Sequence, residues 1–394
     1  SGTPKKRISD IETSVSMPLK VLFVSRAYPP IVGGIENQNA ALAIWLKEHV
    51  EVTTIANRFG KKFLPIFLPY ALCRALISAR SFDAILLGDG VLSVIGWAVK
   101  LLYRKKAVLS VVHGLDITYP LFIYQALWVR RFIPKLDRLI AVGNETISLG
   151  INHGIAREKF EFIPNGVDPE AHYRPDFTRN DLEAIIGNVQ RGTTVILTSG
   201  RLVRRKGVAW FIRNVLPTLP EETLYVVSGD GVDRDNIRNA VEETGTFERV
   251  KLLGYVNDRT RDILMNTCDI FVQPNIPVPG DVEGFGITPI EAASCGIPVI
   301  VSRLEGLKDA FSDGENGVFA APEDSADWKE KVERFIADKE ERRAFGARAR
   351  RYTVQHFNWK TVSARYASII QDTVARTDGK CQSHLQDLAG KTLK

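Results

Sequence analysis

Residues 283–291, EGFGITPIE, place two glutamates eight positions apart, around a Gly-Phe-Gly loop and a Thr-Pro step. Gly284 and Gly286 permit backbone conformations that other residues resist, and they let a ligand approach the main chain closely. The free amides at the start of a following helix form an anion site. A loop that offers a carboxylate, bare amides and then a second carboxylate suits a ligand that carries both sugar hydroxyls and phosphates.

The second glutamate of this stretch also has a purely structural interpretation. Thr288, Pro289 and Glu291 match the N-cap, N1 and N3 positions of a helix, which is the pattern of a capping box. In that interpretation the Glu291 carboxylate accepts a hydrogen bond from the amide of Thr288. Glu283 has no comparable explanation. From this stretch alone, both interpretations of Glu291 stay open.

The length of 394 residues is enough for two α/β domains, each with its own core. Hydrophobic residues make up 45% and charged residues 25%, as in soluble globular proteins. No uncharged apolar run approaches the roughly 18 residues of a membrane-spanning helix. The four cysteines lack the paired spacing of metal or redox sites, which predicts free thiols in a reducing cytoplasm. Residues 1–16 and 377–394 are interpreted as polar tails outside the fold.

The positive charge of the chain is concentrated in its first half. Residues 17–168 contain 18 Lys and Arg against 11 Asp and Glu, a net charge of +7, whereas residues 169–394 contain 31 against 33, a net charge of −2. The basic residues are interleaved with long apolar runs and match no nucleic-acid-binding motif, so no nucleic acid partner is predicted. An anionic membrane surface or a phosphate-bearing substrate fits this charge better.

A strand, glycine loop and helix pattern occurs in both halves. KVLFVS (20–25) is followed by a Pro-Pro-Gly-Gly loop and a helical pattern over 36–49, the start of a Rossmann-like unit. Further strands are expected in EVTTIA, DAILLG, AVLSVVHG, RLIAVG, FEFIPN, TTVILTSG, TLYVVSGDG, RVKLLGYV, DIFVQPN and IPVIVS. The pattern predicts an α/β fold with two Rossmann-like domains, 17–180 and 190–355. The polar stretch 169–192 is the expected interdomain linker.

The unusual residues follow the predicted strands directly. Open α/β sheets bind ligands outside the carboxyl ends of their strands. The residues expected there are Gly33, Gly34, His113, Arg201, Lys206 and Glu283 to Gly286. Arg201 and Lys206 can neutralise a diphosphate leaving group without a metal, because arginine binds phosphate as a planar fork and lysine as a point charge. The competing interpretation of this charge run is a solvated basic turn.

His113 follows an apolar strand, which aims it into the predicted cleft, where it can hydrogen-bond a sugar hydroxyl or stabilise developing charge. A histidine at such a position also serves structural roles. The triplet Asp233-Arg234-Asp235 lies at the start of a predicted surface helix and has no supporting ligand cluster. The sequence therefore predicts no metal site and no cofactor.

Taken in order, these segments resemble the retaining, nucleotide-sugar-dependent glycosyltransferases of the GT-B fold, family four, group 1. The most specific part is EGFGITPIE, and PPIVGGIE, HGLD, PNGVD, GRLVRRKG, SGDG and GYV support it in the expected order. The resemblance covers nearly all of residues 19–375. It implies that the two domains face each other across a cleft, and that a closing helix at 356–376 crosses back to the first domain. The nucleotide-sugar donor is then a substrate.

The resemblance also implies roles for single residues. Glu283 faces the donor sugar, Glu291 binds the ribose hydroxyls, and Arg201 and Lys206 hold the diphosphate. His113 matches the active-site histidine, so that His113, Glu283, Arg201 and Lys206 form the catalytic set. The other expected donor contacts are Gly34 near the leaving phosphate, Val256 beside the base, and Gly200, Gly284, Phe285, Gly286 and Ile287.

The expected acceptor site lies in the first domain. Residues 61–80 and 119–139 mix aromatic with basic residues, as interfacial helices do, although core helices with charged faces fit the same pattern. The sequence thus predicts a peripheral enzyme on the cytoplasmic face of a membrane, which glycosylates a lipid-linked glycan during lipopolysaccharide or other surface polysaccharide assembly. A nucleotide-sugar epimerase and a catalytically silent GT-B scaffold are the alternatives. UDP, GDP and ADP donors are not distinguished.

Overall fold

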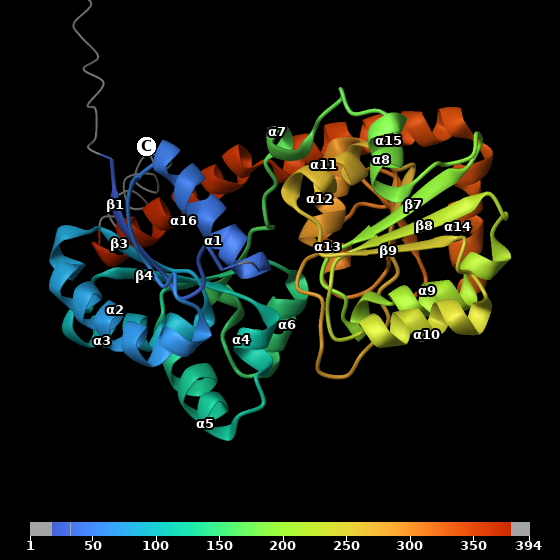
Figure 1. The fold of residues 1–394 in the computed structure, drawn as a ribbon. Coiled ribbons are helices and arrows are strands. Elements are labelled where there is room, and N and C mark those ends of the chain that lie inside the picture. The colour runs from blue at the N-terminus through green and yellow to red at the C-terminus, as the bar shows by residue number, and fades with distance from the viewer. Residues whose placement is uncertain (1–17, 32, 380–394) are drawn as a thin grey trace, which may run out of the picture.

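The structure, a computed structural model, describes residues 18–31 and 33–379, and it consists of two α/β halves (Figure 1). Each half contains a six-stranded parallel sheet, with the strand orders β2-β1-β3-β4-β5-β6 and β12-β11-β10-β7-β8-β9. The predicted pair of Rossmann-like sheets is confirmed. Of the tails expected at 1–16 and 377–394, residues 1–16 and 380–394 lie outside the described residues, whereas Thr377 is the last residue of helix α16 (Trp359–Thr377).

The first sheet and its helices come from residues 20–162. Its strands are β1 (Lys20–Ser25), β2 (Glu51–Ala56), β3 (Ala84–Leu87), β4 (Ala107–Val112), β5 (Arg138–Ala141) and β6 (Phe160–Phe162). Its helices are α1 (Gly34–Trp45), α2 (Leu64–Ser78), α3 (Ser93–Leu102), α4 (Gly114–Thr118), α5 (Phe122–Tyr124), which continues as a π-helix over Gln125–Phe132, and α6 (Asn144–Asn152).

The second sheet repeats the scheme. Its strands are β7 (Thr194–Ser199), β8 (Thr223–Ser228), β9 (Val250–Gly254), β10 (Ile270–Gln273), β11 (Val299–Ser302) and β12 (Val318–Ala320). The helices are α7 (Pro169–His172), α8 (Arg179–Ile186), α9 (Val208–Asn214), α10 (Arg234–Thr244), α11 (Asp258–Thr267), α12 (Ile287–Cys295), α13 (Leu307–Ala310), α14 (Ser325–Ala337), α15 (Lys339–Phe357) and α16 (Trp359–Thr377).

The central strands are buried on both faces, as parallel sheets covered by helices require. In β1, Val21 and Phe23 pack in one apolar cluster, and Leu22 and Val24 pack in another on the opposite face. This alternation explains why the strands appear in the sequence as continuous apolar runs. The three-residue edge strand β12 was not among the strands predicted from the sequence.

The closing helix α16 crosses back to the first domain, as expected. Figure 1 shows α16 beside the first domain. Its residues Trp359, Val362 and Tyr366 belong to the apolar cluster that contains Val21 and Phe23 of β1. The two chain segments that pass between the domains are paired with each other. The amide of Val167 donates to the carbonyl of Phe357 at 2.7 Å, and the amide of Trp359 donates to the carbonyl of Val167 at 3.1 Å. Both crossings therefore run side by side.

The expected linker at 169–192 differs from the structure. It contains α7 and α8, and α8 begins with a capping box in which the Asp181 carboxylate accepts from the amide and the hydroxyl of Thr178. Leu182 and Ile186 pack into the core of the second domain. Polar and turn-forming residues dominate this stretch because α8 is a short surface helix with a single buried face.

Helix α2 and its flanking 3-10 turns, Lys61–Ser81, are long and apolar enough by length and composition to cross a membrane, and 22% of the most apolar window is buried. The screen for uncharged runs missed it because charged residues lie within it. Phe67, Ala71 and Ala75 form a narrow buried stripe that packs on the first sheet. Ile66, Tyr70 and Ile77 are exposed.

Candidate active site

The carboxyl ends of the two sheets meet at the 283–287 loop. A Cβ atom on Gly34 would lie 3.9 Å from Cδ1 of Ile287 in the opposite domain. At the start of α6, the amide of Asn144 donates to Oδ2 of Asp309 and its Nδ2 donates to Oδ1, both at 2.7 Å. A Cβ atom on Gly143 would lie 3.1 Å from the carbonyl oxygen of Gly284. The structure thus brings the loops predicted for the donor site of both domains together.

Glu283 is buried, and its charge is compensated on one oxygen only. Oε2 lies 2.5 Å from Nζ of Lys206 and 3.6 Å from Arg205, and it accepts from Nδ2 of Asn275 at 3.3 Å and from Nε2 of Gln273 at 3.4 Å. Among the described residues, no hydrogen bond reaches Oε1. Glu283 therefore keeps one carboxylate oxygen available for a ligand hydroxyl.

Electrostatics keep Glu283 ionised. Burial alone would raise the pKa of its carboxyl, but Lys206 and Arg205 outweigh that effect and lower the pKa to about 2. The paired side chains lie 77 positions apart in the chain, one on the loop after β7 and one on the loop after β10. Because both groups are charged and mostly buried, removing either one would leave the other as an uncompensated charge inside the protein.

The capping interpretation of Glu291 is wrong. Helix α12 begins at Ile287 after Gly286 in the left-handed conformation, and no side chain caps it. Thr288 lies inside the first turn, so its amide is not the group that an N3 glutamate would reach. Oε1 of Glu291 lies 3.8 Å from Nε2 of His172, whose Nδ1 contacts Asp262 at 2.8 Å. The half-buried Glu291 carboxylate is thus free to accept ligand hydroxyls.

A direct consequence concerns the variant Glu291→Ala. Because no cap is lost, we expect the free energy of unfolding to change by less than about 0.5 kcal/mol, as for ordinary surface substitutions. Nucleotide affinity is expected to fall roughly tenfold, as when a charge-assisted hydrogen bond to a ligand is removed. Chemical unfolding and calorimetric titration of nucleoside diphosphates measure the two effects. If the variant is destabilised and its nucleotide affinity is unchanged, Glu291 has a structural role and not a binding role.

The cations expected to hold the diphosphate differ in their surroundings. Arg201 follows β7 and is exposed, and it forms no ion pair with any residue that the structure describes. Lys206 ends a 3-10 turn, Arg204–Lys206, and is paired with Glu283. A Cβ atom on Gly200 would lie 3.7 Å from Oγ1 of Thr288, which places the start of this basic loop against the first turn of α12.

The glycine loop is shaped by packing beneath it. Gly286 has φ +84, and a Cβ atom there would lie 2.5 Å from Cδ2 of Leu307, so only glycine fits. The ring of Phe285, a residue expected among the donor contacts, is buried and packs 6.0 Å, centroid to centroid, from Phe357. Only the main chain of Phe285 can face a ligand. The ring instead anchors the loop to the end of α15.

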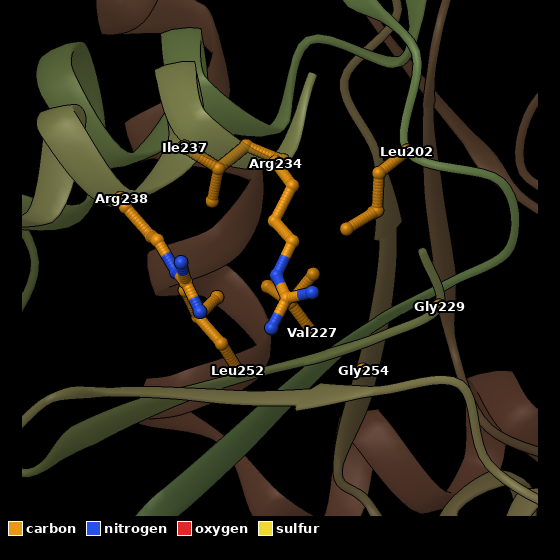
Figure 2. Close-up of a pocket in the computed structure, with 8 residues that line it drawn as sticks. All are labelled: Leu202, Val227, Gly229, Arg234, Ile237, Arg238, Leu252 and Gly254. Atoms are coloured by element: carbon orange, nitrogen blue, oxygen red, sulfur yellow. The ribbon is translucent and has the colours of Figure 1, made fainter. Parts of the chain in front are cut away.

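The ends of β8 and β9, together with helix α10 and the basic loop, enclose a small pocket, which Figure 2 shows in close-up. It is lined by Leu202, Val227, Gly229, Arg234, Ile237, Arg238, Leu252 and Gly254. Gly229 packs so tightly on the basic loop that a Cβ atom would lie 1.8 Å from the carbonyl oxygen of Gly200. The half-buried Val256, expected beside the base, follows Gly254 by two residues. This end of the sheet therefore adjoins the basic loop that begins at Gly200.

The first domain contributes a buried polar cluster that faces the cleft. His113 directly follows β4, and its amide donates to Oδ2 of Asp116 at 2.9 Å, while Nε2 of its ring is buried without a partner among the described residues. Nε of Arg26, after β1, donates to Oδ1 of Asp89, after β3, at 2.9 Å. The hydroxyl of Tyr124 donates to the carbonyl of Asp116 at 3.0 Å.

Burial sets the protonation states in this cluster. It lowers the pKa of His113 to about 4, so that the imidazole is neutral near pH 7. It raises the pKa of Asp89 to about 6, against the opposing effect of Arg26. A neutral histidine with an unsatisfied ring nitrogen can hydrogen-bond a hydroxyl without adding positive charge.

No grouping of three or more His, Cys, Asp or Glu side chains suited to a metal ion occurs within residues 18–31 and 33–379. Asp233 precedes α10, and its Oδ1 accepts from Nδ2 of Asn236 at 3.1 Å, while Asp235 lies in the first turn. The triplet therefore lies at the start of helix α10, the position expected from the sequence.

Two family models match the chain. The model described as glycosyl transferases group 1 matches residues 183–352, and the model described as glycosyltransferase family 4 matches residues 32–171. The first match contains Arg201, Lys206 and both glutamates of the 283–291 stretch, and the second contains His113. The chain belongs to this glycosyltransferase family. The resemblance carried by the ordered motifs is confirmed.

Relatives of the glycosyltransferase align over nearly their whole length. A GDP-mannose-dependent α-(1-6)-phosphatidylinositol monomannoside mannosyltransferase from Mycolicibacterium smegmatis is 24% identical over 378 residues, which is 89% of this chain and 98% of that protein. An uncharacterised glycosyltransferase from Methanocaldococcus jannaschii is 25% identical over 396 residues, 89% of this chain and 97% of its own.

Solved structures establish the GT-B fold. Anabaena HepE in complex with UDP and glucose has a TM-score of 0.70 at 19% identity, and the match covers 90% of this chain and 100% of that chain. WaaG, a glycosyltransferase involved in lipopolysaccharide biosynthesis, has a TM-score of 0.60 at 19% identity over 89% of this chain and 99% of its own. The expected fold class, two Rossmann-like domains with a crossing helix, is confirmed.

The sequence analysis missed several polar residues of the cleft. Arg26, Asp89 and Asn275 each follow a strand by one or two residues, the same signal that identified His113 and Arg201. They were not singled out because they lie outside the ordered motifs. Glu305, whose carboxylate accepts from the amide of Glu283, follows β11 by three residues and gave no motif signal.

Proposed function

We propose that the glycosyltransferase transfers a sugar from a nucleotide-sugar donor to an acceptor with retention of anomeric configuration and without a metal. The observation that carries this proposal is the geometry of one loop system. Glu283 begins the 283–287 loop, Glu291 lies on the helix that follows it, and Lys206 pairs with Glu283 from the same basic loop as Arg201. The 283–287 loop lies against Gly34 at the start of α1 in the first domain. Solved relatives with UDP and UDP-glucose bound support a nucleotide-sugar donor.

The reaction that fits these residues is a front-face displacement. Arg201 and Lys206 neutralise the charge that develops on the departing diphosphate, which lowers the barrier through preorganised electrostatics. The departing phosphate oxygen accepts the proton of the acceptor hydroxyl, so no separate nucleophile is needed. Oε1 of Glu283 holds a hydroxyl of the donor sugar, and neutral His113 holds the reacting sugar from the first domain. The cations take the place that a metal fills in other transferases.

The experiment is an assay with UDP-glucose, GDP-mannose and ADP-glucose, each with and without a bacterial lipid extract, in the presence of EDTA. We expect acceptor-dependent release of nucleoside diphosphate and a glycosylated lipid product, identified by mass spectrometry. Isomerised donor in the absence of lipid would instead identify the epimerase alternative. Activity that EDTA abolishes would contradict the metal-free mechanism. A silent scaffold is disfavoured because all four ionic residues of the donor site are present.

The acceptor proposed is a lipid-linked glycan at the cytoplasmic face of a membrane, in surface polysaccharide or lipopolysaccharide assembly. Its support is the surface of the first domain. Ile66, Tyr70 and Ile77 on α2 are exposed at 69%, 54% and 76%, and Leu121 and Phe122 at the start of α5 at 55% and 82%. Exposed cations accompany them, namely Lys61, Lys62, Arg74, Arg130, Arg131 and Lys135. Apolar side chains beside cations are the pattern of interfacial binding.

Membrane docking predicts a salt-sensitive preference for anionic liposomes. Each basic residue near such a surface contributes roughly 1 kcal/mol, so that neutralising five should weaken binding by at least a hundredfold. The test variant carries glutamine at Lys61, Lys62, Arg130, Arg131 and Lys135, and cosedimentation with anionic and neutral liposomes measures binding.

A matched variant carries glutamine at five exposed cations of the second domain, Arg191, Arg259, Lys339, Arg343 and Arg351. It is expected to bind anionic liposomes as the wild type does. Absence of wild-type binding to either liposome type, or equal weakening in both variants, would leave a soluble acceptor as the better hypothesis.

A further inference from the structure

Glu305 adopts a backbone conformation that a glutamate rarely takes. Its φ is +48, in the left-handed region, and within the described residues only Glu323, with φ +57, is another non-glycine residue with positive φ. A side chain with a Cβ atom is strained there, and such strain persists only where the surroundings enforce it. Residues held in this way concentrate at functional sites.

The contacts of Glu305 show what enforces this conformation. Its Oε2 accepts from the main-chain amide of Glu283 at 2.5 Å. The amide of the next residue, Gly306, donates back to the carbonyl of Glu283 at 3.1 Å. A Cβ atom on Gly306 would lie 2.3 Å from the carbonyl oxygen of Gly284. The turn at 305–306 thus binds the main chain of Glu283 on both its amide and its carbonyl group.

The electrostatic environment of Glu305 is unfavourable for a second carboxylate. Burial raises its pKa, and the negative charges of Glu283 and Asp281 act in the same direction, although the amide of Glu283 and Arg205 oppose them. A half-buried carboxylate beside Glu283 is therefore retained despite both strain and like-charge repulsion. The bond to the Glu283 amide is its one direct hydrogen bond to a protein group in the described chain.

We propose that Glu305 is a positioning residue for the donor sugar, because its carboxylate fixes the main chain from which Glu283 presents Oε1 to the cleft. This inference rests on the proposed role of Glu283. The side chain of Glu283 is held through Oε2 by Lys206 and Asn275, and its backbone is held by Glu305. Because both the carboxylate and the main chain of Glu283 are held, the direction in which its free Oε1 points is fixed. Loss of the Glu305 side chain frees the main chain of Glu283 but leaves Arg201 and Lys206, the cations proposed to hold the diphosphate, in place.

The test compares Glu305→Gly with the wild type in two titrations, one with a nucleoside diphosphate and one with the matching nucleotide sugar. The pairs are UDP with UDP-glucose, GDP with GDP-mannose and ADP with ADP-glucose. Glycine tolerates positive φ, so the melting temperature is expected to hold or rise. The ratio of the Kd of the nucleotide sugar to that of the diphosphate is expected to rise about 10- to 100-fold, with the diphosphate Kd unchanged, because one charge-assisted bond that orients Glu283 is lost.

Two further variants separate positioning from strain. Glu323→Gly relieves the same kind of strain at an exposed position before α14 and should leave the ratio of the two Kd values at its wild-type value. Glu305→Gln keeps a side-chain oxygen that accepts from the Glu283 amide, and it should recover most of the ratio.

Three outcomes of these titrations overturn the account. A wild-type ratio in Glu305→Gly contradicts the positioning role while leaving the proposed function intact. Equal weakening of diphosphate and nucleotide sugar assigns Glu305 to folding of the whole loop and also contradicts the positioning role. Failure of all three diphosphates to bind the wild type overturns the proposed donor site itself, and this inference with it.

Discussion

Replacing Lys206 by alanine is expected to have the largest effect of any single substitution in the donor site. Glu283 would lose the partner that lies 2.5 Å from its Oε2, and it would remain as an incompletely compensated charge inside the protein. Breaking a buried ion pair in this way costs roughly 3–5 kcal/mol of folding free energy. Turnover should fall by roughly 10²–10³, because preorganised charge stabilisation at the leaving group is lost.

The double variant Lys206→Ala with Glu283→Gln provides the control for this prediction. It removes the uncompensated charge, so most of the lost stability should return while turnover stays low. Urea unfolding and steady-state kinetics measure the two quantities. If Lys206→Ala unfolds like the wild type, or if the double variant recovers turnover, the ion pair does not have the role assigned to it.

Arg201→Ala is expected to separate catalysis from stability. Arg201 is exposed and makes no ion pair within the described chain, so its removal should change the free energy of unfolding by less than about 0.5 kcal/mol. Turnover should nevertheless fall by roughly 10²–10³, since the guanidinium stabilises charge that develops only as the diphosphate leaves. Kinetics on the same donor and acceptor as for Lys206→Ala test this result.

Arg204 offers a matched control for Arg201, because it is also an exposed arginine of the basic loop. It lines a separate hollow of about 530 Å³ on the second domain, together with Trp210, Arg213 and Glu323. Arg204→Ala is expected to keep wild-type turnover. Equal losses in the two variants would mean that the overall charge of the loop matters, and near-normal turnover in Arg201→Ala would contradict the diphosphate assignment.

The fold was predictable because its strands are short, apolar and followed by glycine or polar residues. KVLFVS and ten further runs correspond to β1 through β11, and burial on both faces explains why central strands such as β1, β4 and β7 show no alternation. The linker at 169–192 could not be predicted in the same way. The residues Thr178 and Asp181, which form the capping box of α8, are equally common in polar loops. Only the burial of Leu182 in the structure shows that a helix packs there.

The candidate site was predictable to the level of its loops but not of its contacts. The capping interpretation of Glu291 was wrong because Gly286 takes the left-handed conformation and the helix begins at Ile287, two residues before Pro289. The burial of the Phe285 ring, the pairing of Lys206 with Glu283 and the hold of Glu305 on that loop all depend on residues distant in the chain. Only tertiary packing determines such contacts.

The most direct test of the account is a calorimetric titration of UDP, GDP and ADP into the wild-type glycosyltransferase and into Arg201→Ala, in buffer with EDTA. At least one diphosphate is expected to bind the wild type without metal. Its affinity should be at least tenfold weaker for Arg201→Ala, as expected for the loss of a charged hydrogen bond to phosphate. Absence of binding until Mg²⁺ is added, or equal affinity in both proteins, would contradict the metal-free donor site.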